Sequence, residues 1–312
     1  MEVIRSINDI KTLPESCVTI GNFDGVHNGH RILIKKTTDY AKEKGIKSVV
    51  FTFANHPSNY FVPGIIKNIL DENEKIELIE SCGADYLLNI PFETYMTKMS
   101  SQSFVEDILI EKINVKKVIV GHDFTFARKK EGTAEVLVEM GQKYGFEVEI
   151  VQPIKVNDIR ISSTHIRKLI SEGKMDEVPL FLGRNYSIRG EVIHGMANGR
   201  KIGFPTANIK VNKELVMPGC GIYVSIVKIN DKNYYGATNV GFNPTVNGKG
   251  LSIETHILDF EESIYGKIIE IEFLERIRDE KKFCSMDELR EQLSHDVGYI
   301  REKYSKYKLQ KV

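Results

Sequence analysis

The sequence predicts an α/β domain built on a parallel sheet, followed by an antiparallel β-barrel domain that ends in a helix. Three observations lead to this prediction. The chain has 312 residues, which is enough for about two domains of roughly 150 residues each. In the first half, short apolar segments alternate with segments of helical spacing, as in a parallel sheet with helices on its faces. After Gly183 the pattern changes to closely spaced strand-like segments separated by Gly and Pro, which is typical of a compact barrel.

The first half contains five expected strands, each a short run rich in β-branched or aromatic residues: 17–20, 48–53, 86–90, 117–120 and 147–151. Helical spacing of apolar residues predicts helices between them, at 30–44, 73–81, 103–112 and 133–144. Two of the strands end directly at a glycine, Gly21 and Gly121. Ligands of open parallel sheets bind beyond the carboxyl ends of the strands, so we expect the site of this domain there.

Two further helices are expected before the pattern changes, at 163–172 and 175–182. The strands expected after Gly183 follow at close spacing: 186–193, 221–229, 234–240, 252–258 and 267–274. Ser285 and Glu288 form a Ser-x-x-Glu capping pattern that opens a final amphipathic helix. We place the domain boundary so that residues 1–183 form the first domain and 184–312 the second.

The composition excludes several classes of protein. Basic and acidic residues balance at 43 each, whereas proteins that bind nucleic acid backbones usually carry a basic excess. No apolar run approaches the ~18 residues of a membrane-spanning helix. The four cysteines stand far apart and form no CxxC pair, so a zinc ribbon, a redox pair and a disulfide framework are all disfavoured. We therefore expect a cytoplasmic protein, a monomer or weak homo-oligomer, without nucleic acid or membrane partners.

The first expected strand is joined to the first helix by the segment GNFDGVHNGH, residues 21–30. It places His27 and His30 near a helix N-terminus, where free N–H groups and the helix dipole favour phosphate. Imidazoles held there can donate hydrogen bonds to phosphate oxygens as charge grows in a transition state. Gly25 and Gly29 allow the backbone to approach a ligand closely.

A later segment, ISSTHIR at 161–167, lies at an expected helix start. The hydroxyls of Ser163 and Thr164 and the guanidinium of Arg167 suit a polyphosphate, although an ordinary helix cap has the same appearance. No Walker-type GxxxxGK[ST] segment is present, so phosphates must be held by another device.

The second domain contains the glycine-rich segment GMANGRKIGFPTAN, residues 195–208. Gly195 and Gly203 permit tight turns whose backbone N–H groups can hold phosphates. Pro205 makes the chain rigid before Thr206 and Asn208, which point the same way if the chain is extended. Their oxygens could face a Mg²⁺ ion held mainly by ATP phosphates. A plain turn would explain Gly-Phe-Pro-Thr alone.

These segments together carry a resemblance to a known family. Residues 21–30 resemble the HxGH signature of the nucleotidylyltransferase superfamily, in the GNFDGVHxGH form of the bacterial bifunctional riboflavin kinase/FAD synthetase family. Residues 195–208 are similar to that family's GRxxGxPTAN kinase signature, and further matches follow at 221–223, 239–245 and 254–260. The resemblance implies a Rossmann-like nucleotidylyltransferase domain with a parallel sheet, followed by a riboflavin kinase barrel.

For the first domain, the resemblance implies transfer of AMP from ATP to FMN, which gives FAD and pyrophosphate. His27 and His30 would be catalytic, and the other residues implied to contact ATP or its phosphates are Gly21, Phe23, Asp24, Gly25, Gly29, Ser163, Thr164 and Arg167. Asp123 and Phe124 would contact the flavin. Their loop departs from the family pattern Gly-x-Asp-Phe-Arg-Phe-Gly, because Thr125 stands where Arg is common and Ala127 where Gly is common. Residues 52–57 fit the family loosely.

For the second domain, the resemblance implies phosphorylation of riboflavin to FMN by ATP with Mg²⁺. Glu254 would be the general base, since a hydroxyl is a poor nucleophile until a proton acceptor lies within reach; an isolated Glu in a strand otherwise faces solvent. The implied ATP contacts are Gly195, Gly203, Pro205, Thr206 and Asn208, of which Thr206 and Asn208 would also bind the metal. Arg276 and Arg278 fit a flavin-side flap, where core packing is the alternative.

Two other functions remain open at this point. Thr125 and Ala127 leave room for a riboflavin kinase whose first domain is inactive or uses another nucleotide. A non-catalytic flavin-binding sensor is the alternative from a different class. A sensor needs no general base, so the presence of Glu254 argues against it.

Overall fold

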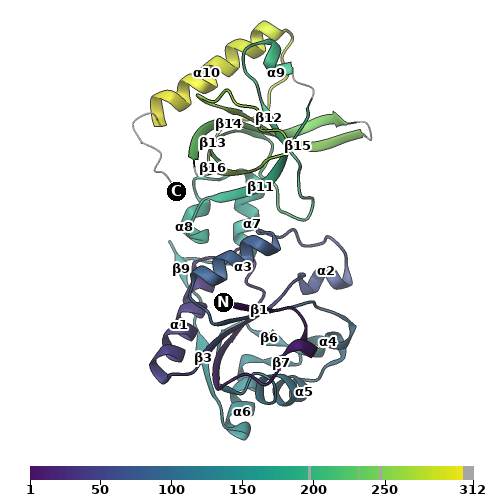
Figure 1. Cartoon of the computed structure of the whole chain (residues 1–312), viewed down its shortest axis with the longest axis vertical. Coiled ribbons are helices and arrows are strands. Elements are labelled where there is room, and N and C mark those ends of the chain that lie inside the picture. The colour runs from purple at the N-terminus through teal and green to yellow at the C-terminus, as the bar shows by residue number, and fades with distance from the viewer. Residues whose placement is uncertain (196–197, 231, 246–247, 305–312) are drawn as a thin grey trace. The chain divides into compact units, whose positions relative to one another are not determined.

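The computed structural model describes residues 1–195, 198–230, 232–245 and 248–304. The side chains of 198, 201, 243–245 and 248–249 are not described. The chain divides into two compact units, Met1–Ser163 and Thr164–Val312, and each unit is described by itself (Figure 1). The sequence placed the boundary twenty residues later, after residue 183, and that boundary stays a prediction about domains.

The first unit contains a six-stranded sheet in which every pairing is parallel. Its strands are β1 (Glu2–Ile4), β2 (Ser16–Ile20), β3 (Lys47–Phe53), β4 (Tyr86–Ile90), β5 (Val115–Gly121) and β8 (Glu147–Val151), in the order β1-β4-β3-β2-β5-β8. The five predicted strands and their parallel arrangement are confirmed. The edge strand β1 was missed, because three residues are too few to show a period.

The helices of this unit connect the strands and cover the sheet (Figure 1). They are α1 (Asn28–Lys44), α2 (Pro57–Phe61), α3 (Glu72–Ser81), α4 (Thr94–Lys98), α5 (Ser101–Ser103) and α6 (Ala134–Tyr144), with short 3-10 turns at Ile7–Asp9 and Arg128–Lys130. The helix expected at 103–112 is instead a π-helix over Phe104–Ile110. The Glu111 N–H bonds the Glu106 carbonyl five residues back, the pattern that defines a π-helix. Two small hairpins complete the unit: β6 (Thr125–Phe126) with β7 (Gly132–Thr133), and β9 (Lys155–Val156) with β10 (Ile159–Arg160).

The strand order fixes where a ligand can bind in this unit. From β2 the chain proceeds outward to β3 and β4 on one side, and it then crosses to β5 and β8 on the other. The loops that leave β2 and β5 therefore diverge at the point where the order reverses, which is where open α/β sheets bind ligands. These are the loops that begin at Gly21 and Gly121, as the sequence predicts.

The second unit contains a closed barrel whose six strands all pair antiparallel. The strands are β11 (Tyr186–Ile193), β12 (Ala207–Ile209), β13 (Gly221–Ile229), β14 (Lys232–Thr245), β15 (Gly248–Ile257) and β16 (Ile268–Arg278), and they close in the order β11-β12-β15-β14-β13-β16. The predicted barrel is confirmed; the three-residue strand β12 was not predicted. Buried aromatic rings fill the interior, where Phe273 packs on both Tyr186 and Tyr223.

The described residues around the barrel form the helices α7 (Ser163–Glu172), which begins at the last residue of the first unit, α8 (Val178–Leu182), α9 (Asn198–Lys201) and α10 (Met286–Tyr304). The helix α8 begins three residues later than expected, because Pro179 lies in its first turn, a position that proline favours. The capping prediction for α10 is confirmed in part. The Glu288 N–H donates to Ser285 Oγ, but the Glu288 carboxylate accepts from Cys284 N–H and not from the Ser285 N–H. Within the described ranges, no helix is both long and apolar enough to cross a membrane.

Candidate functional site

The loop between β2 and α1 has an unusual backbone. Phe23 and Val26 adopt φ values of 46° and 39°, and Gly25 lies between them at 87°. Positive φ is costly for residues with a side chain, and such strain persists where surrounding structure holds it. Both side chains are fully buried, so the apolar core of the unit anchors a loop that the local backbone alone would not favour.

His27 is the residue immediately before α1, and its side chain caps the helix. Its Nδ1 accepts a hydrogen bond of 3.2 Å from the His30 N–H. Because Nδ1 accepts, the neutral imidazole carries its proton on Nε2. The two rings stack with centroids 3.5 Å apart, and a Cβ on Gly29 would lie 3.2 Å from the His27 ring. The fold therefore brings both predicted catalytic histidines together at the N-terminus of α1.

Asp24 connects this loop to two other segments of the unit. Its Oδ1 accepts a 2.8 Å hydrogen bond from the Ile69 N–H, and its backbone carbonyl accepts one of 2.8 Å from Ser163 Oγ. The predicted phosphate residue Ser163 thus lies beside the GNFDGVHNGH loop. Thr164 and Arg167 belong to the second unit, in the first turns of α7.

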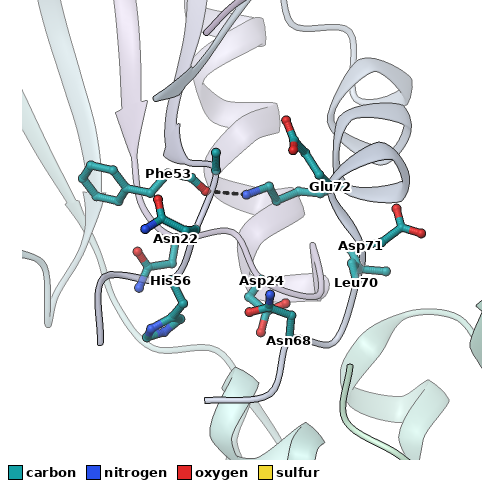
Figure 2. A pocket seen from close by; sticks show the side chains of 11 residues that line it. Asn22, Asp24, Phe53, His56, Asn68, Leu70, Asp71 and Glu72 are labelled. Atoms are coloured by element: carbon teal, nitrogen blue, oxygen red, sulfur yellow. Dashed lines mark hydrogen bonds between the residues drawn. The ribbon is translucent and has the colours of Figure 1, made fainter. Parts of the chain in front are cut away.

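A pocket with about 350 Å³ of empty space adjoins this loop, and Figure 2 shows the side chains around it. Asn22, Asp24, His56 and Asn68 are among them, and Phe53 and Glu72 lie on different sides. The complete lining is Asn22, Asp24, Phe53, Ala54, Asn55, His56, Asn68, Leu70, Asp71, Glu72 and Lys75. Asn22 and Asp24 belong to the predicted segment 21–30, and residues 53–56 belong to the loosely matched segment 52–57.

Lys75 is the one lysine among these lining residues, which also include three carboxylates. Its ammonium donates a 2.6 Å hydrogen bond to the Phe53 carbonyl, drawn as a dashed line in Figure 2. Burial lowers the pKa of Lys75 from 10.5 to about 8, although the charges of Asp24 and Glu72 act in the opposite direction. A buried amine with a pKa near neutrality is a feature common at functional sites. A single Lys within a helical stretch gave no sequence signal for this.

The loop that follows β5 places Asp123 and Phe124 at the same end of the sheet. Asp123 accepts a 2.6 Å hydrogen bond from Arg160. Burial alone would raise the pKa of Asp123, but the hydrogen bond and the charge of Arg160 outweigh it and lower that pKa. The Phe124 ring stacks on Phe126 with centroids 5.5 Å apart. Ala127 adopts φ 65° and ψ −177°, a backbone region used almost only by glycine.

In the barrel, Glu254 lies between two asparagines on adjoining strands. It is directly opposite Asn208 of β12 on one side and Asn239 of β14 on the other. Directly opposed residues of neighbouring strands share a face of the sheet, with Cβ atoms about 5 Å apart. We call Asn208, Glu254 and Asn239 the Glu254 row. The predicted base and the predicted metal ligand Asn208 are therefore neighbours, although 46 residues separate them in the sequence.

The glycine-rich segment before β12 packs on this row. A Cβ on Gly195 would lie 2.6 Å from Asn208 Cγ, so only glycine permits this approach. Gly203 has a φ of 86°, the turn conformation that the sequence predicts. The Pro205 carbonyl accepts a 2.9 Å hydrogen bond from His256 Nδ1, and burial lowers the pKa of His256, which favours the neutral ring. Residues 196–197 of the segment lie outside the described residues.

The two arginines predicted to contact flavin are both engaged within the unit. Arg278 makes a bidentate ion pair with Asp296 of α10, with distances of 2.7 Å from Nη2 and 3.1 Å from Nε, and Asp296 is fully buried. Arg276 bonds the Cys220 carbonyl and forms a 2.9 Å ion pair with Asp279. The Arg278 pair is partly buried, in line with the core-packing alternative, whereas Arg276 pairs with the exposed Asp279. The flavin role of both arginines stays a prediction.

The donor atoms of the barrel site suit Mg²⁺. The described residues contain no group of three or more His, Cys, Asp or Glu side chains that could hold a metal by themselves. Mg²⁺ prefers oxygen ligands and is commonly bound through one or two protein groups together with substrate phosphates. The Thr206 hydroxyl and the Asn208 amide oxygen are ligands of this kind.

A parallel sheet with two histidines at a helix N-terminus, and a barrel with a carboxylate beside a glycine-rich loop, define an enzyme that transfers groups from nucleotides. Comparison with known proteins specifies which. The FAD synthetase family model matches residues 9–165, and the riboflavin kinase family model matches residues 182–304. The chain belongs to the bifunctional riboflavin kinase/FMN adenylyltransferase family.

Two relatives illustrate how complete the match is. The Bifunctional riboflavin kinase/FMN adenylyltransferase of Escherichia coli is 35% identical over 306 residues, which cover 97% of each chain. The protein of the same name from Haemophilus influenzae is 34% identical over 95% of this chain and 97% of its own. A crystal structure titled macrolide-efflux protein from Streptococcus pneumoniae has a TM-score of 0.89 at 34% identity, and the match covers 97% of this chain and 100% of that one.

Proposed function

We propose that the chain makes FMN from riboflavin and ATP in its barrel unit, and FAD from FMN and ATP in its sheet unit. One observation carries this proposal: the family's two signatures fall on two separate compact units, and in each unit signature residues from distant segments are neighbours. His27 and Ser163 both contact the loop after β2 or its helix, and Glu254 stands opposite Asn208.

In the kinase reaction, Glu254 accepts the proton of the terminal ribityl hydroxyl as its oxygen bonds to the γ-phosphorus of ATP. The bond from that phosphorus to the bridging oxygen breaks, and ADP leaves. Gly195 and Gly203 let the backbone N–H groups approach the phosphates, and Thr206 and Asn208 would hold Mg²⁺. The ion, when bound, neutralises phosphate charge.

In the adenylyl transfer, a phosphate oxygen of FMN attacks the α-phosphorus of ATP, and pyrophosphate leaves. The attacking group is already anionic, so no protein nucleophile is required. His27 and His30 donate hydrogen bonds to the phosphate oxygens, and the N-terminus of α1 adds its dipole. The catalytic contribution of the protein is then positioning and charge stabilisation.

The test is to supply riboflavin, ATP and Mg²⁺ to the purified full chain and to separate FMN and FAD by chromatography. Glu254→Gln should abolish FMN formation yet spare FAD formation from supplied FMN. Glu191→Gln, an exposed barrel glutamate, is the matched control and should make both products. His27→Asn keeps a good helix-capping residue but removes the imidazole, so FAD formation should fall while FMN formation persists.

The same assays separate the alternatives. If FMN forms but supplied FMN yields neither FAD nor pyrophosphate, the chain is a riboflavin kinase with an inactive first unit. Tight flavin binding without any turnover would instead indicate the sensor. Mg²⁺ dependence, the monomeric or weakly associating state, and the cytoplasmic location remain predictions from the sequence.

A further inference from the structure

The Glu254 row contains one residue to which the proposed mechanism assigns no role. Asn239 lies directly opposite Glu254 on β14, as Asn208 does on β12. The two asparagines therefore flank the general base on the same face of the barrel. The sequence singled out Asn208 through the family signature, whereas Asn239 was part of a longer match without a role of its own.

The amide oxygen of Asn239 is buried and has no hydrogen-bond partner among the described residues. The large majority of buried polar atoms in native proteins are paired, because an unpaired one costs free energy. The neighbouring positions on the same face of β14 are covered by protein. Ala237 packs in a cluster with Ile300 of α10, which lies against the barrel in Figure 1. A Cβ on Gly241 would overlap the carboxylate of Glu280.

The unpaired oxygen thus lies beside the base, between two covered positions, and is an acceptor without a donor. A substrate hydroxyl supplies such a donor. An amide suits this place better than a second carboxylate, because a like charge next to Glu254 would raise the pKa of the base. An amide oxygen accepts a hydroxyl hydrogen bond without adding charge.

We propose that Asn239 is a substrate-positioning residue of the kinase site, which accepts a hydrogen bond from a ribityl hydroxyl next to the one that reacts. This bond aligns the terminal hydroxyl with Glu254 and selects flavins that carry a polyol chain. The inference rests on the proposed kinase function and adds to it the residue that recognises the sugar-alcohol part of the substrate.

Binding measurements test the inference apart from turnover. Riboflavin and lumiflavin share the ring system, but lumiflavin has a methyl group in place of the ribityl chain. Quenching of flavin fluorescence should show that Asn239→Ala weakens riboflavin binding about 3- to 10-fold, the effect of one neutral hydrogen bond, and leaves lumiflavin binding unchanged. Asn233→Ala, on the same strand and six residues away, is the matched control and should bind both flavins as the wild type does.

Turnover supplies a second readout. Asn239→Ala should lower kcat/KM for riboflavin by about 10- to 100-fold, because the reacting hydroxyl loses its alignment, while FAD formation from supplied FMN stays at the wild-type rate. Asn239→Asp should move the acidic limb of the kinase pH profile to higher pH, because a carboxylate beside Glu254 raises the pKa of that base.

Two results would overturn the inference: equal loss of riboflavin and lumiflavin binding in Asn239→Ala, or wild-type riboflavin binding and kcat/KM. Failure of the proposed function is distinguishable from both. A wild-type chain that forms no FMN would refute the kinase, while the comparison of riboflavin with lumiflavin would still decide whether Asn239 recognises the ribityl chain.

Discussion

Replacing Lys75 with Met should change how the stability of the first unit depends on pH. The native pKa of Lys75 is about 8 against an ordinary value of 10.5, so the unfolded chain binds more protons than the native one between these values. The free energy of unfolding therefore rises with pH across that window, since the cost of burying the charge disappears once the amine is neutral. A neutral amine can still donate to the Phe53 carbonyl.

The size of the effect follows from the shift. At about 1.4 kcal/mol per pKa unit, a charged Lys75 costs the native state roughly 3 kcal/mol at pH 7, and about 2.5 kcal/mol of this is recovered by pH 10. For a unit of this length, that corresponds to a rise of about 5–10 °C in melting temperature. Lys75→Met removes the titration while keeping the length of the side chain.

Calorimetry of the full chain at pH 7 and pH 10 measures this directly. Other groups also titrate in this range, so the relevant quantity is the difference in melting temperature between the wild type and Lys75→Met. Between pH 7 and pH 10, the melting temperature of the wild type should rise relative to that of Lys75→Met by about 5–10 °C. Lys42→Met, which removes an exposed lysine of α1, serves as the control. An offset between wild type and Lys75→Met that is the same at both pH values would refute the reasoning.

Three further predictions concern the backbone and the packing of the sites. Ala127→Gly should stabilise the first unit by about 0.5–2 kcal/mol. The substitution removes about 1–3 kcal/mol of backbone strain, while the greater freedom of glycine in the unfolded chain costs about 0.5–1 kcal/mol. An unchanged or lower melting temperature in calorimetry would contradict this. Asp296→Ala should destabilise the barrel by about 3–5 kcal/mol, because it leaves the Arg278 guanidinium without its buried partner; urea denaturation followed by circular dichroism measures the loss, and FAD formation from FMN should persist. Gly195→Ala should lower the rate of FMN formation by about 100-fold through displacement of Asn208, whereas its melting temperature should stay close to that of the wild type.

Sequence patterns predicted the class and order of most elements because each long segment shows its own period. The predicted bounds of β11, 186–193, agree with the structure at both ends, because buried and exposed side chains largely alternate along this segment. The strands β1 and β12 each have three residues and owe their pairing to neighbours that are distant in the chain. The π-helix at 104–110 has the apolar spacing of an α-helix, so the sequence alone could not distinguish the two.

The candidate sites were predictable where one contiguous segment carries several unusual residues, as 21–30 and 195–208 do. The pocket of the first unit was not, because its lining comes from separate segments around residues 22–24, 53–56 and 68–75. Residues 22–24 belong to the unusual segment 21–30, but residues 53–56 and 68–75 have the sequence pattern of an ordinary loop and helix start. The role of Asn239 could not be predicted for a related reason. Its proximity to Glu254 depends on the strand register, and the lack of a hydrogen-bond partner for its amide oxygen depends on the three-dimensional surroundings.

Ala127 departs from the family pattern, yet its backbone has a conformation that glycine favours. A residue that cannot adopt the glycine conformation would be expected to alter the loop after β5, and Ala127, together with Thr125, is why the sequence leaves an inactive first domain open. The backbone at Ala127 nevertheless lies in the glycine region, and the next N–H donates a 2.9 Å hydrogen bond to the Met99 carbonyl. Ala127 thus adopts a backbone conformation that favours glycine, at a cost in strain. Asp123 and Phe124 follow the end of β5 in the same loop, and Ala127 by itself gives no reason to expect an inactive adenylyltransferase.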